Sequence, residues 1–312
     1  MARPESELTK KWQNSTQPLV SVVCITYNHE RFIRDAIESF LAQETDFAFS
    51  IVIAEDCSSD NTLAIVDEYC RLYPRVIKLI KNEKNLGVIE NFFRTIDSVT
   101  TKYAAVCEGD DYWTNPHKLQ TQIDFLQENP EYSMVCHPVS ILNETQNCAA
   151  VKKAYEKFVS GHFTTRDILR GHFIPTPSLT FRTDAFHLYD WMLACRSGDI
   201  ALELILSLSG PGCFMPEPMA VYRQHDDGIT KKGRLPPAEM LEKSLFLFRA
   251  FDKLTKGIYT DGVNRRLAKI HFIYAVGRLK KFEICLFMFH CWSAMKYAVK
   301  GIMCRSKADV RL

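Results

Sequence analysis

The chain has 312 residues, of which 46% are hydrophobic and 24% are charged. This composition is typical of a globular protein and excludes a disordered chain or a collagen-like repeat. With 39 basic and 37 acidic residues the net charge is only +2, which argues against a dedicated nucleic-acid binder, because such proteins are usually clearly basic.

The charges are unevenly distributed. Residues 263–312 contain eleven Lys and Arg against two acidic residues, a net charge of +9, which leaves −7 on residues 1–262. This division suggests that chemistry and docking are separated along the chain. The eleven cysteines form no CxxC pair, which indicates reduced thiols, and the first residues include no apolar stretch typical of a signal peptide. We therefore expect a cytoplasmic protein.

From residue 19 the chain alternates apolar runs of strand length with segments of helical period. Strands are predicted at 20–25, 50–54, 76–80 and 103–107, and helices between them at 31–43, 62–73 and 88–99. This alternation predicts an α/β fold, with a single Rossmann-like, mostly parallel central sheet and helices on both faces.

The later part of the chain is less regular. It contains a predicted helix at 118–128, a short strand at 134–136, helices near 185–194 and 200–209, and a strand pair at 213–216 and 219–223. A Gly- and Pro-rich stretch at 226–237 is followed by predicted helices at 238–256, 262–277 and 281–303. The expected organisation is an N-terminal extension at 1–17, an α/β domain at 18–230 and a basic helical C-terminal extension at 238–312.

Polar residues follow the predicted strands. They are Thr26, Tyr27 and Asn28 after the first strand, Glu55 and Asp56 after the second, and Glu108, Asp110 and Asp111 after the fourth. Open α/β sheets bind ligands at the carboxyl ends of their strands, so these groups are expected on one rim. No GxGxxG or GxxxxGK[S/T] phosphate loop is present.

The acidic residues on this rim predict a metal site. Clustered carboxylates repel one another unless a cation joins them, and Mg²⁺ or Mn²⁺ suits oxygen ligands and substrate phosphates. For Asp56 and Asp60 alone, a turn and a cap of the next helix are the favoured explanation of the pattern. Asp110 and Asp111, paired directly after an apolar strand, leave a functional and a structural interpretation open.

Six segments, taken in order, carry a resemblance to a known family. They are PLVSVVCITYNHERFI (18–33), IAEDCSSDNT (53–62), NLGV (85–88), EGDDYWTNPHKL (108–119), SGD (197–199) and EPMAVYRQH (217–225). Together they resemble the successive signatures of inverting glycosyltransferases of family 2, which have the GT-A fold. The resemblance implies that residues 18–230 are a GT-A catalytic domain.

The resemblance also implies the roles of individual residues. The nucleotide would be held by Thr26, Tyr27, Asn28, Glu55, Asp56, Asp110 and Arg223. Asp56 would accept the ring N–H of uracil if the donor is UDP-linked, and Asp110 would contact the ribose. Asp111 and His225 would ligate Mn²⁺ or Mg²⁺ at the diphosphate, Asp199 would be the general base, and Lys231 would assist from a loop.

The resemblance is incomplete at two positions. Cys57 stands where the family commonly has Gly. Glu108 stands where Asp is common, and its longer side chain is expected to keep it from ligating the metal directly. Two of the site residues also have structural interpretations, because Asp199 suits a helix N-cap and His225 suits a satisfied core histidine.

The implied activity is transfer of a sugar from a nucleotide diphosphate sugar to a hydroxyl of a saccharide or lipid-linked acceptor, in polysaccharide or glycolipid synthesis. Two alternatives stay open. A sugar nucleotidyltransferase also uses an α/β sheet and a metal, although the Gly-rich basic loop expected after its first strand is absent here. A non-catalytic, transferase-like binding or assembly subunit is the other alternative.

The basic tail has apolar residues at three- and four-residue spacing between 284 and 302. Its uncharged part, 284–295, is shorter than the roughly 20 residues needed to span a bilayer. A helix packed on the catalytic domain and an in-plane membrane anchor both fit this pattern. The second interpretation predicts peripheral contact through 281–312 with the inner face of a membrane.

Overall fold

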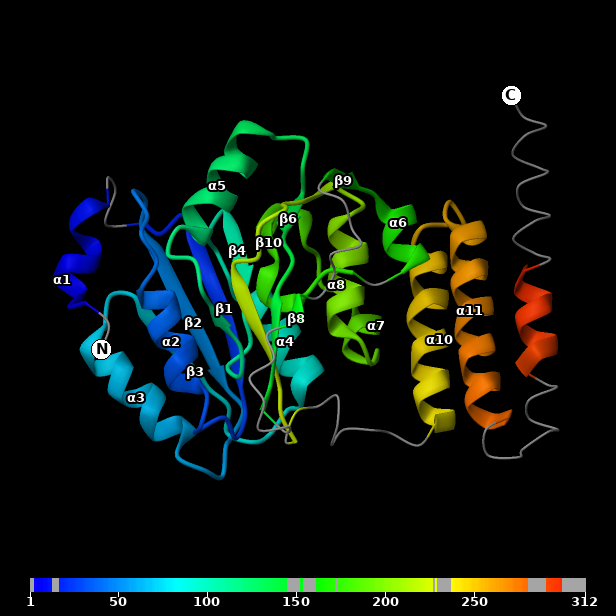
Figure 1. Ribbon diagram of the computed structural model, residues 1–312, viewed down its shortest axis with the longest axis horizontal. Helices are drawn as coiled ribbons and strands as arrows, with labels where there is room; N and C mark the ends of the chain where they lie inside the picture. The colour runs from blue at the N-terminus through cyan, green and yellow to red at the C-terminus, as the bar shows by residue number, and fades with distance from the viewer. Residues whose placement is uncertain are drawn as a thin grey trace. The chain divides into compact units, whose positions relative to one another are not determined.

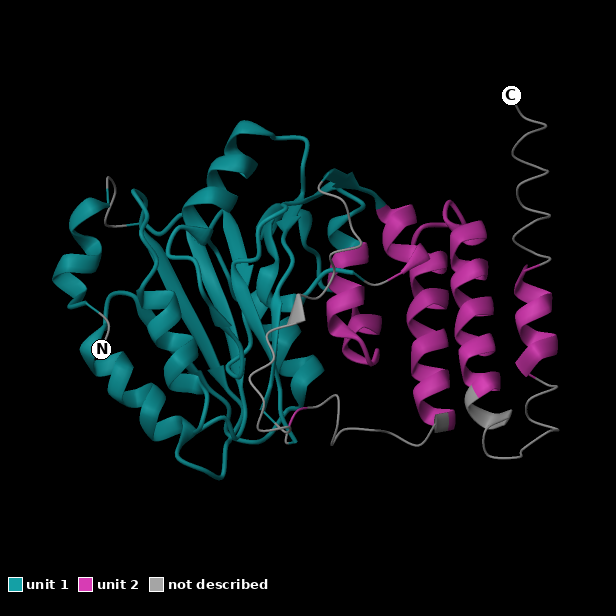
Figure 2. Ribbon diagram, viewed as in Figure 1, with its two compact units in different colours: residues 1–164, 173–188, 205–227 teal, residues 165–172, 189–204, 228–312 magenta. Residues whose placement is uncertain are grey.

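The computed structural model describes residues 3–12, 17–144, 152–153, 161–171, 173–226, 228, 237–279 and 290–298. The chain divides into two compact units (Figure 2). Unit 1 comprises residues 1–164, 173–188 and 205–227, and unit 2 comprises residues 165–172, 189–204 and 228–312. Two inner segments of the chain therefore belong to the same unit as the C-terminal helices.

Unit 1 is built on an eight-stranded sheet with the strand order β3-β2-β1-β4-β10-β6-β11-β9 (Figure 1). Its strands are β1 (Val20–Thr26), β2 (Phe49–Glu55), β3 (Ile77–Lys81), β4 (Tyr103–Val106), β6 (Met134–Cys136), β9 (Gly161–Phe163), β10 (Thr180–Arg182) and β11 (Gly212–Phe214). β3, β2, β1 and β4 pair in parallel, whereas β10 is antiparallel to both of its neighbours. The predicted α/β central sheet is confirmed.

Helices cover this sheet because its inner strands are apolar on both faces. They are α2 (Ile33–Leu41), α3 (Thr62–Leu72), α4 (Val88–Asp97) and α5 (Lys118–Glu128). All seven residues of β1 are buried, and its alternate residues Val20, Val22 and Cys24 share a core cluster with Ile37 and Phe40 of α2. α4 also contacts β1 and β2, and α3 lies beside β2 and β3 (Figure 1).

A second, four-stranded sheet lies in unit 1, with the order β5-β12-β7-β8. Its strands are β5 (Tyr112–Trp113), β7 (Ser140–Asn143), β8 (Lys152–Lys153) and β12 (Ala220–Gln224). The predicted strand pair at 213–216 and 219–223 is wrong as a pair, because β11 joins the large sheet and β12 joins the small one. Pro216 and Pro218 lie between them, and proline cannot donate to a shared ladder.

The helix predicted near 185–194 is also wrong over most of its length. A short 3₁₀ turn, η4 (Thr183–Ala185), is followed by extended chain and then by the single turn α7 (Asp190–Leu193). The N-terminal extension begins with α1 (Glu5–Leu8) and η1 (Thr9–Lys11), and Leu8 is buried in the core cluster of unit 1.

Unit 2 contains α6 (Thr165–Arg170), α7, most of α8 (Gly198–Leu206), α10 (Pro237–Leu254) and α11 (Thr260–Leu279). α10 and α11 pack side by side, as Figure 2 shows, and α11 also packs on α6. Residues 290–298 are helical too, whereas the rest of the helix predicted at 281–303 lies outside the described residues. Within the described part of the chain, no helix has the length and apolar content needed to cross a membrane.

Candidate active site

The loops after β1 and β2 are tied together at the carboxyl end of the sheet. Asn28 and Cys57 have left-handed backbones, with φ of 53° and 61°. The Asn28 N–H donates to Ser58 Oγ at 2.9 Å, and Asn28 Oδ1 accepts from the Ser59 N–H at 2.8 Å. Left-handed φ favours glycine, so Cys57 occupies a backbone conformation that a glycine would adopt more readily. The two loops therefore form one connected rim.

Two of the predicted nucleotide contacts, Thr26 and Tyr27, lie on this rim and differ in exposure. Tyr27 is 43% exposed and thus open to a ligand. Thr26 is buried, and its Oγ1 has no hydrogen-bond partner among the described residues. A Cβ on Gly109 would lie only 2.8 Å from that Oγ1, so the acidic loop after β4 approaches β1 more closely than a side chain at 109 permits.

Glu55 and Asp56 are buried and bind the backbone of neighbouring loops. Glu55 Oε1 accepts from the Ser58 N–H at 2.7 Å. Asp56 Oδ1 accepts from the Leu86 N–H at 2.8 Å and from Asn82 Nδ2 at 2.9 Å, and Oδ2 accepts from the Gly87 N–H at 2.9 Å. Asp56 therefore holds the loop between β3 and α4 in addition to its predicted role.

The acidic residues after β4 converge as the sequence predicts. Ligand atoms of Glu108, Asp110 and Asp111 all lie within 4.8 Å of one another. Asp111 is fully buried, its Oδ1 accepts from the Arg223 N–H at 2.8 Å, and its Oδ2 has no partner among the described residues. β12 thus fixes the position of the Asp111 carboxyl by a backbone hydrogen bond.

The two aspartates have pKa values that are shifted in opposite directions. Burial, together with the charges of Asp110 and Glu108, raises the pKa of Asp111 well above its usual range. Burial opposes ionisation of Asp110 as well, but its hydrogen bond to His225 and the charge of His29 outweigh burial, so the pKa of Asp110 is lowered. One carboxylate of the pair is therefore held ionised at the expense of the other.

Two histidines flank Asp110. His225 Nε2 lies 3.1 Å from Asp110 Oδ2, and His29 Nε2 lies 3.9 Å from the same oxygen. The His225 ring packs on Phe32, with 4.5 Å between ring centroids, and its Nδ1 is buried without a partner among the described residues. The sequence prediction missed His29, although its position directly after Asn28 on the first loop is a usable signal.

Arg223 lies on β12 beside the acidic cluster. Its guanidinium bonds Asp35, lies 3.6 Å from Glu144 Oε1, and stacks over the rings of Tyr112 and Phe32 at 4.6 and 5.2 Å. Its side chain is only 6% exposed. Arg223, predicted as a nucleotide contact, thus lies beside two carboxylates that the sequence prediction did not include.

The acidic cluster fits a hard divalent cation. Asp111 Oδ2 and Asp110 Oδ1 are both buried and lack hydrogen-bond partners among the described residues. Burying an unpaired carboxylate oxygen is unfavourable, whereas a divalent cation would satisfy it and would reverse the repulsion that raises the pKa of Asp111.

The structure leaves two of the predicted site residues untested. Asp199 lies in the first turn of α8, in a segment that belongs to unit 2. Its assignment as the base stays a prediction. Lys231 lies outside the described residues.

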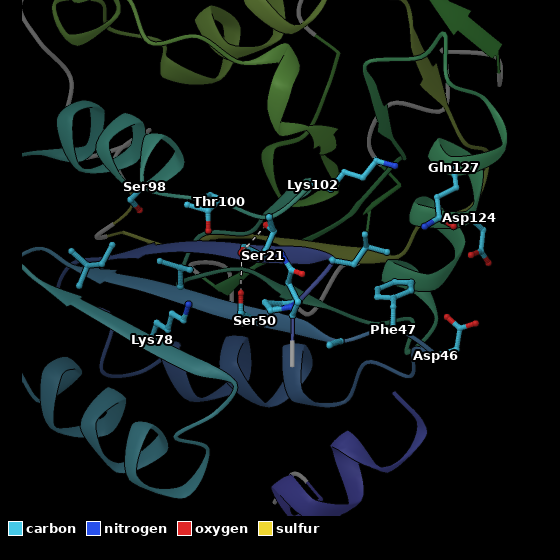
Figure 3. Close-up of a pocket in the computed structure, with 18 residues that line it drawn as sticks. Ser21, Asp46, Phe47, Ser50, Lys78, Ser98, Thr100, Lys102, Asp124 and Gln127 are labelled. Carbon is cyan, nitrogen blue, oxygen red and sulfur yellow. Dashed lines mark hydrogen bonds between the residues drawn. The ribbon is translucent and has the colours of Figure 1, made fainter. Parts of the chain in front are cut away.

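A separate groove of about 730 Å³ lies toward the amino ends of the strands (Figure 3). Ser21 Oγ, near the start of β1, is 2.9 Å from both Ser50 Oγ and Thr101 Oγ1, and Lys78 and Lys102 also line the groove. The acidic cluster follows the carboxyl end of β4, so the groove and the cluster lie at opposite ends of the parallel strands.

Comparison with known proteins places this arrangement in a family. A family model described as "Glycosyl transferase family 2" matches residues 21–191. An uncharacterized protein of Mycobacterium tuberculosis is 34% identical over 220 residues, which are 67% of this chain and 60% of that protein. An uncharacterized glycosyltransferase of Methanocaldococcus jannaschii is 32% identical over 201 residues, 61% of this chain and 68% of that protein. The chain thus spans about 60% of the length of the mycobacterial relative.

Solved structures show the same fold. The structure of S. aureus TarS in complex with UDP-GlcNAc has a TM-score of 0.59 at 16% identity, over 93% of this chain and 92% of that chain. The mannosyltransferase PcManGT of Pyrobaculum calidifontis, in complex with GDP-Man and Mn²⁺, has a TM-score of 0.53 at 12% identity, over 96% of this chain and 92% of that chain. These likenesses support the GT-A type of fold, and because the family match spans more than half of the sequence, the chain belongs to glycosyl transferase family 2.

Proposed function

We propose that the protein is an inverting glycosyltransferase that moves a sugar from a nucleotide diphosphate sugar, UDP-linked in our assignment, to a hydroxyl of a saccharide or lipid-linked acceptor. The observation that carries this proposal is the buried carboxyl of Asp111, whose Oδ2 lacks a partner among the described residues beside Asp110 and Glu108. We further propose that the enzyme acts in polysaccharide or glycolipid synthesis at the cytoplasmic face of a membrane, with peripheral contact through 281–312.

The connected rim after β1 and β2 is assigned to the nucleotide. The exposed ring of Tyr27 offers a stacking surface for the base. Among the described residues, only the Gly87 N–H donates to Asp56 Oδ2, so this oxygen retains acceptor capacity for the ring N–H of uracil. Asn28 and Glu55 shape this rim, and Asp110 is assigned to the ribose.

The metal is assigned to Asp111 and His225, and His225 Nε2 also lies 3.1 Å from Asp110 Oδ2. The structure of PcManGT with GDP-Man and Mn²⁺ supports Mn²⁺ or Mg²⁺ in this role. When bound, the divalent ion supplies positive charge that stabilises the departing diphosphate. Arg223 on β12 adds a second positive charge. In this proposal the donor displaces the contacts that Arg223 makes with Asp35 and Glu144.

Inversion is an in-line displacement, so one carboxylate must take the proton of the attacking acceptor hydroxyl. We assign this step to Asp199. Asp199 lies in the first turn of α8. As the base, Asp199 would accept the proton while the acceptor oxygen bonds to the anomeric carbon and the diphosphate departs.

Calorimetry of UDP binding tests the site assignment. We expect UDP to bind the full chain only when Mn²⁺ is present, and Asp111→Asn to weaken this binding at least tenfold, because the variant loses the ionised ligand. Asp97→Asn, an exposed aspartate on α4, is the matched control and should bind as the wild type does. Binding that is independent of metal and unchanged by Asp111→Asn would refute the assignment.

A further inference from the structure

Another cavity lies within unit 2, between α6 and the first half of α11. Its volume is about 250 Å³, and it is lined mostly by cations, together with Leu169, Asp261 and Gly262. The cations are Arg166, Arg170, Arg265, Arg266 and Lys269. All of these residues belong to unit 2, so this basic pocket is formed within one compact unit.

The acidic residues around the basic pocket do not neutralise it. Asp261 bonds Arg265 and lies 3.9 Å from Arg166, and Asp167 lies 2.9 Å from Arg170. Glu203, which attracts the charge of Arg266, is the remaining acidic neighbour in the part of the chain that the structure describes. Counted over these described residues, five cations face three carboxylates. A cavity with this excess of guanidinium groups suits a phosphate, which accepts several charge-assisted hydrogen bonds.

Arg266 is the least compensated of these cations. Its Nε is buried and has no hydrogen-bond partner among the described residues, while its guanidinium lies 5.4 Å from the ring of Phe248. Burial lowers the pKa of Arg266 although Glu203 attracts its charge. A donor held in this way is available to an anion that enters the pocket.

An exposed apolar surface continues from the basic pocket along α11. Arg265, Lys269, Phe272 and Val276 follow one another at spacings of four, three and four residues, which places them on one face of the helix. Phe272 is 57% exposed and Val276 is 37% exposed, and the adjacent Ile273 is 60% exposed. The face is thus cationic near the pocket and apolar about one to two turns further along.

We propose that this face of α11 and the basic pocket form a docking site for an anionic phospholipid headgroup at a bilayer surface. The headgroup phosphate would enter the pocket, and Phe272, Ile273 and Val276 would enter the interfacial layer, where apolar side chains beside basic residues are favoured. The exposed apolar surface beside the pocket favours a lipid headgroup over free phosphate, because a soluble anion would not contact apolar side chains. The site uses residues 166–276 and is a membrane contact in addition to the one proposed for 281–312.

Vesicle co-sedimentation of the full chain tests this proposal without measuring transfer. We expect binding to vesicles of phosphatidylcholine mixed with an equal amount of phosphatidylglycerol, and none to phosphatidylcholine alone. Arg170→Gln combined with Lys269→Gln changes two exposed side chains of the pocket. It should weaken the binding roughly 30-fold, since each cation near an anionic surface contributes about 1 kcal/mol.

Lys243→Gln combined with Lys253→Gln on α10 removes the same charge outside the pocket and is the matched control, expected to weaken binding less than about threefold. Phe272→Ser should also weaken vesicle binding. Equal losses in the pocket and control variants would overturn the site. A second outcome would also overturn the proposal. If the wild type binds no vesicles, and inorganic phosphate raises its melting temperature but not that of the pocket variant, the ligand is a soluble anion and not a lipid headgroup. Neither result bears on the transfer reaction.

Discussion

Asp111 shows how one residue connects fold and chemistry. It directly follows the acidic turn after β4, and the backbone N–H of Arg223 on β12 holds its Oδ1. The small sheet therefore orients the carboxyl that the large sheet presents. Because both elements are needed, the site depends on a pairing between residues more than one hundred positions apart, which no local pattern reveals.

Lys118 is a buried residue whose charge the proposed mechanism does not use. It is fully buried in α5, donates to Gln122 Oε1 at 2.7 Å, and its Nζ lies 4.2 Å from the ring centroid of Trp113. Burial lowers the pKa of Lys118 to about 7. The unfolded chain keeps this lysine protonated up to a pKa of about 10.4, so between these values the unfolded state binds more protons.

This difference predicts how stability depends on pH. The free energy of unfolding of the wild type should rise relative to that of Lys118→Met as the pH increases from about 7 to about 10, by up to about 1.4 kcal/mol per pH unit. Urea unfolding at several pH values measures the difference. The exposed Lys78→Met serves as control and should give a constant difference. A constant difference for Lys118→Met as well would contradict the assignment of a neutral, buried lysine.

At the scale of elements, the loop between β3 and α4 depends on Asp56. Three donors from Asn82, Leu86 and Gly87 converge on its carboxylate. Gly87 has a positive φ of 83° and is the N-cap of α4, so Asp56 also fixes where that helix begins. The sequence resemblance assigns Asp56 to the nucleotide base, whereas the structure adds this second role.

We expect Asp56→Ala to lower the free energy of unfolding by about 3 kcal/mol, because buried donors to a charged acceptor lose their partner. Chemical denaturation measures this loss, and Asp97→Ala on the exposed side of α4 should change stability by less than about 0.5 kcal/mol. A change of less than about 1 kcal/mol for Asp56→Ala would mean that the loop is held by other contacts.

The sequence predicts elements well where burial is local and repeated. β1 to β4 and α2 to α5 lie within about two residues of their predicted bounds, because apolar residues recur with the period of each element. The pairing of 212–214 and 220–224 with separate sheets depends on distant partners, Met134 to Cys136 for one and Ser140 to Asn143 for the other. Local periodicity contains no information on such partners.

The candidate site follows the same rule. The acidic residues were predictable because they directly follow strands whose carboxyl ends share one rim. Contacts between separate elements were not predictable. They include the approach of His29 to Asp110 and the approach of Asp35 and Glu144 to Arg223. The need for glycine at position 109 is visible only in the structure, where a Cβ at this position would clash with the side chain of Thr26.

For the whole molecule, the net charge of +2 is the sum of two unlike parts. The acidic part contains the cluster after β4, which we propose as the metal site, and the basic part includes Arg265, Arg266 and Lys269 of the pocket on α11. We therefore assign the two charge excesses to separate tasks, donor chemistry in unit 1 and surface attachment in unit 2. Asp199, the proposed base, belongs to unit 2.

Release of nucleoside diphosphate from a panel of nucleotide sugars by the full chain tests the central claim most directly. We predict release from one donor, dependent on Mn²⁺ or Mg²⁺, and a loss of roughly 10²- to 10⁴-fold in Asp199→Asn, because that variant lacks the base. Asp190→Asn on α7, in the same unit, should retain the wild-type rate. Release that persists without a divalent metal, or that Asp199→Asn leaves unchanged, would contradict the account.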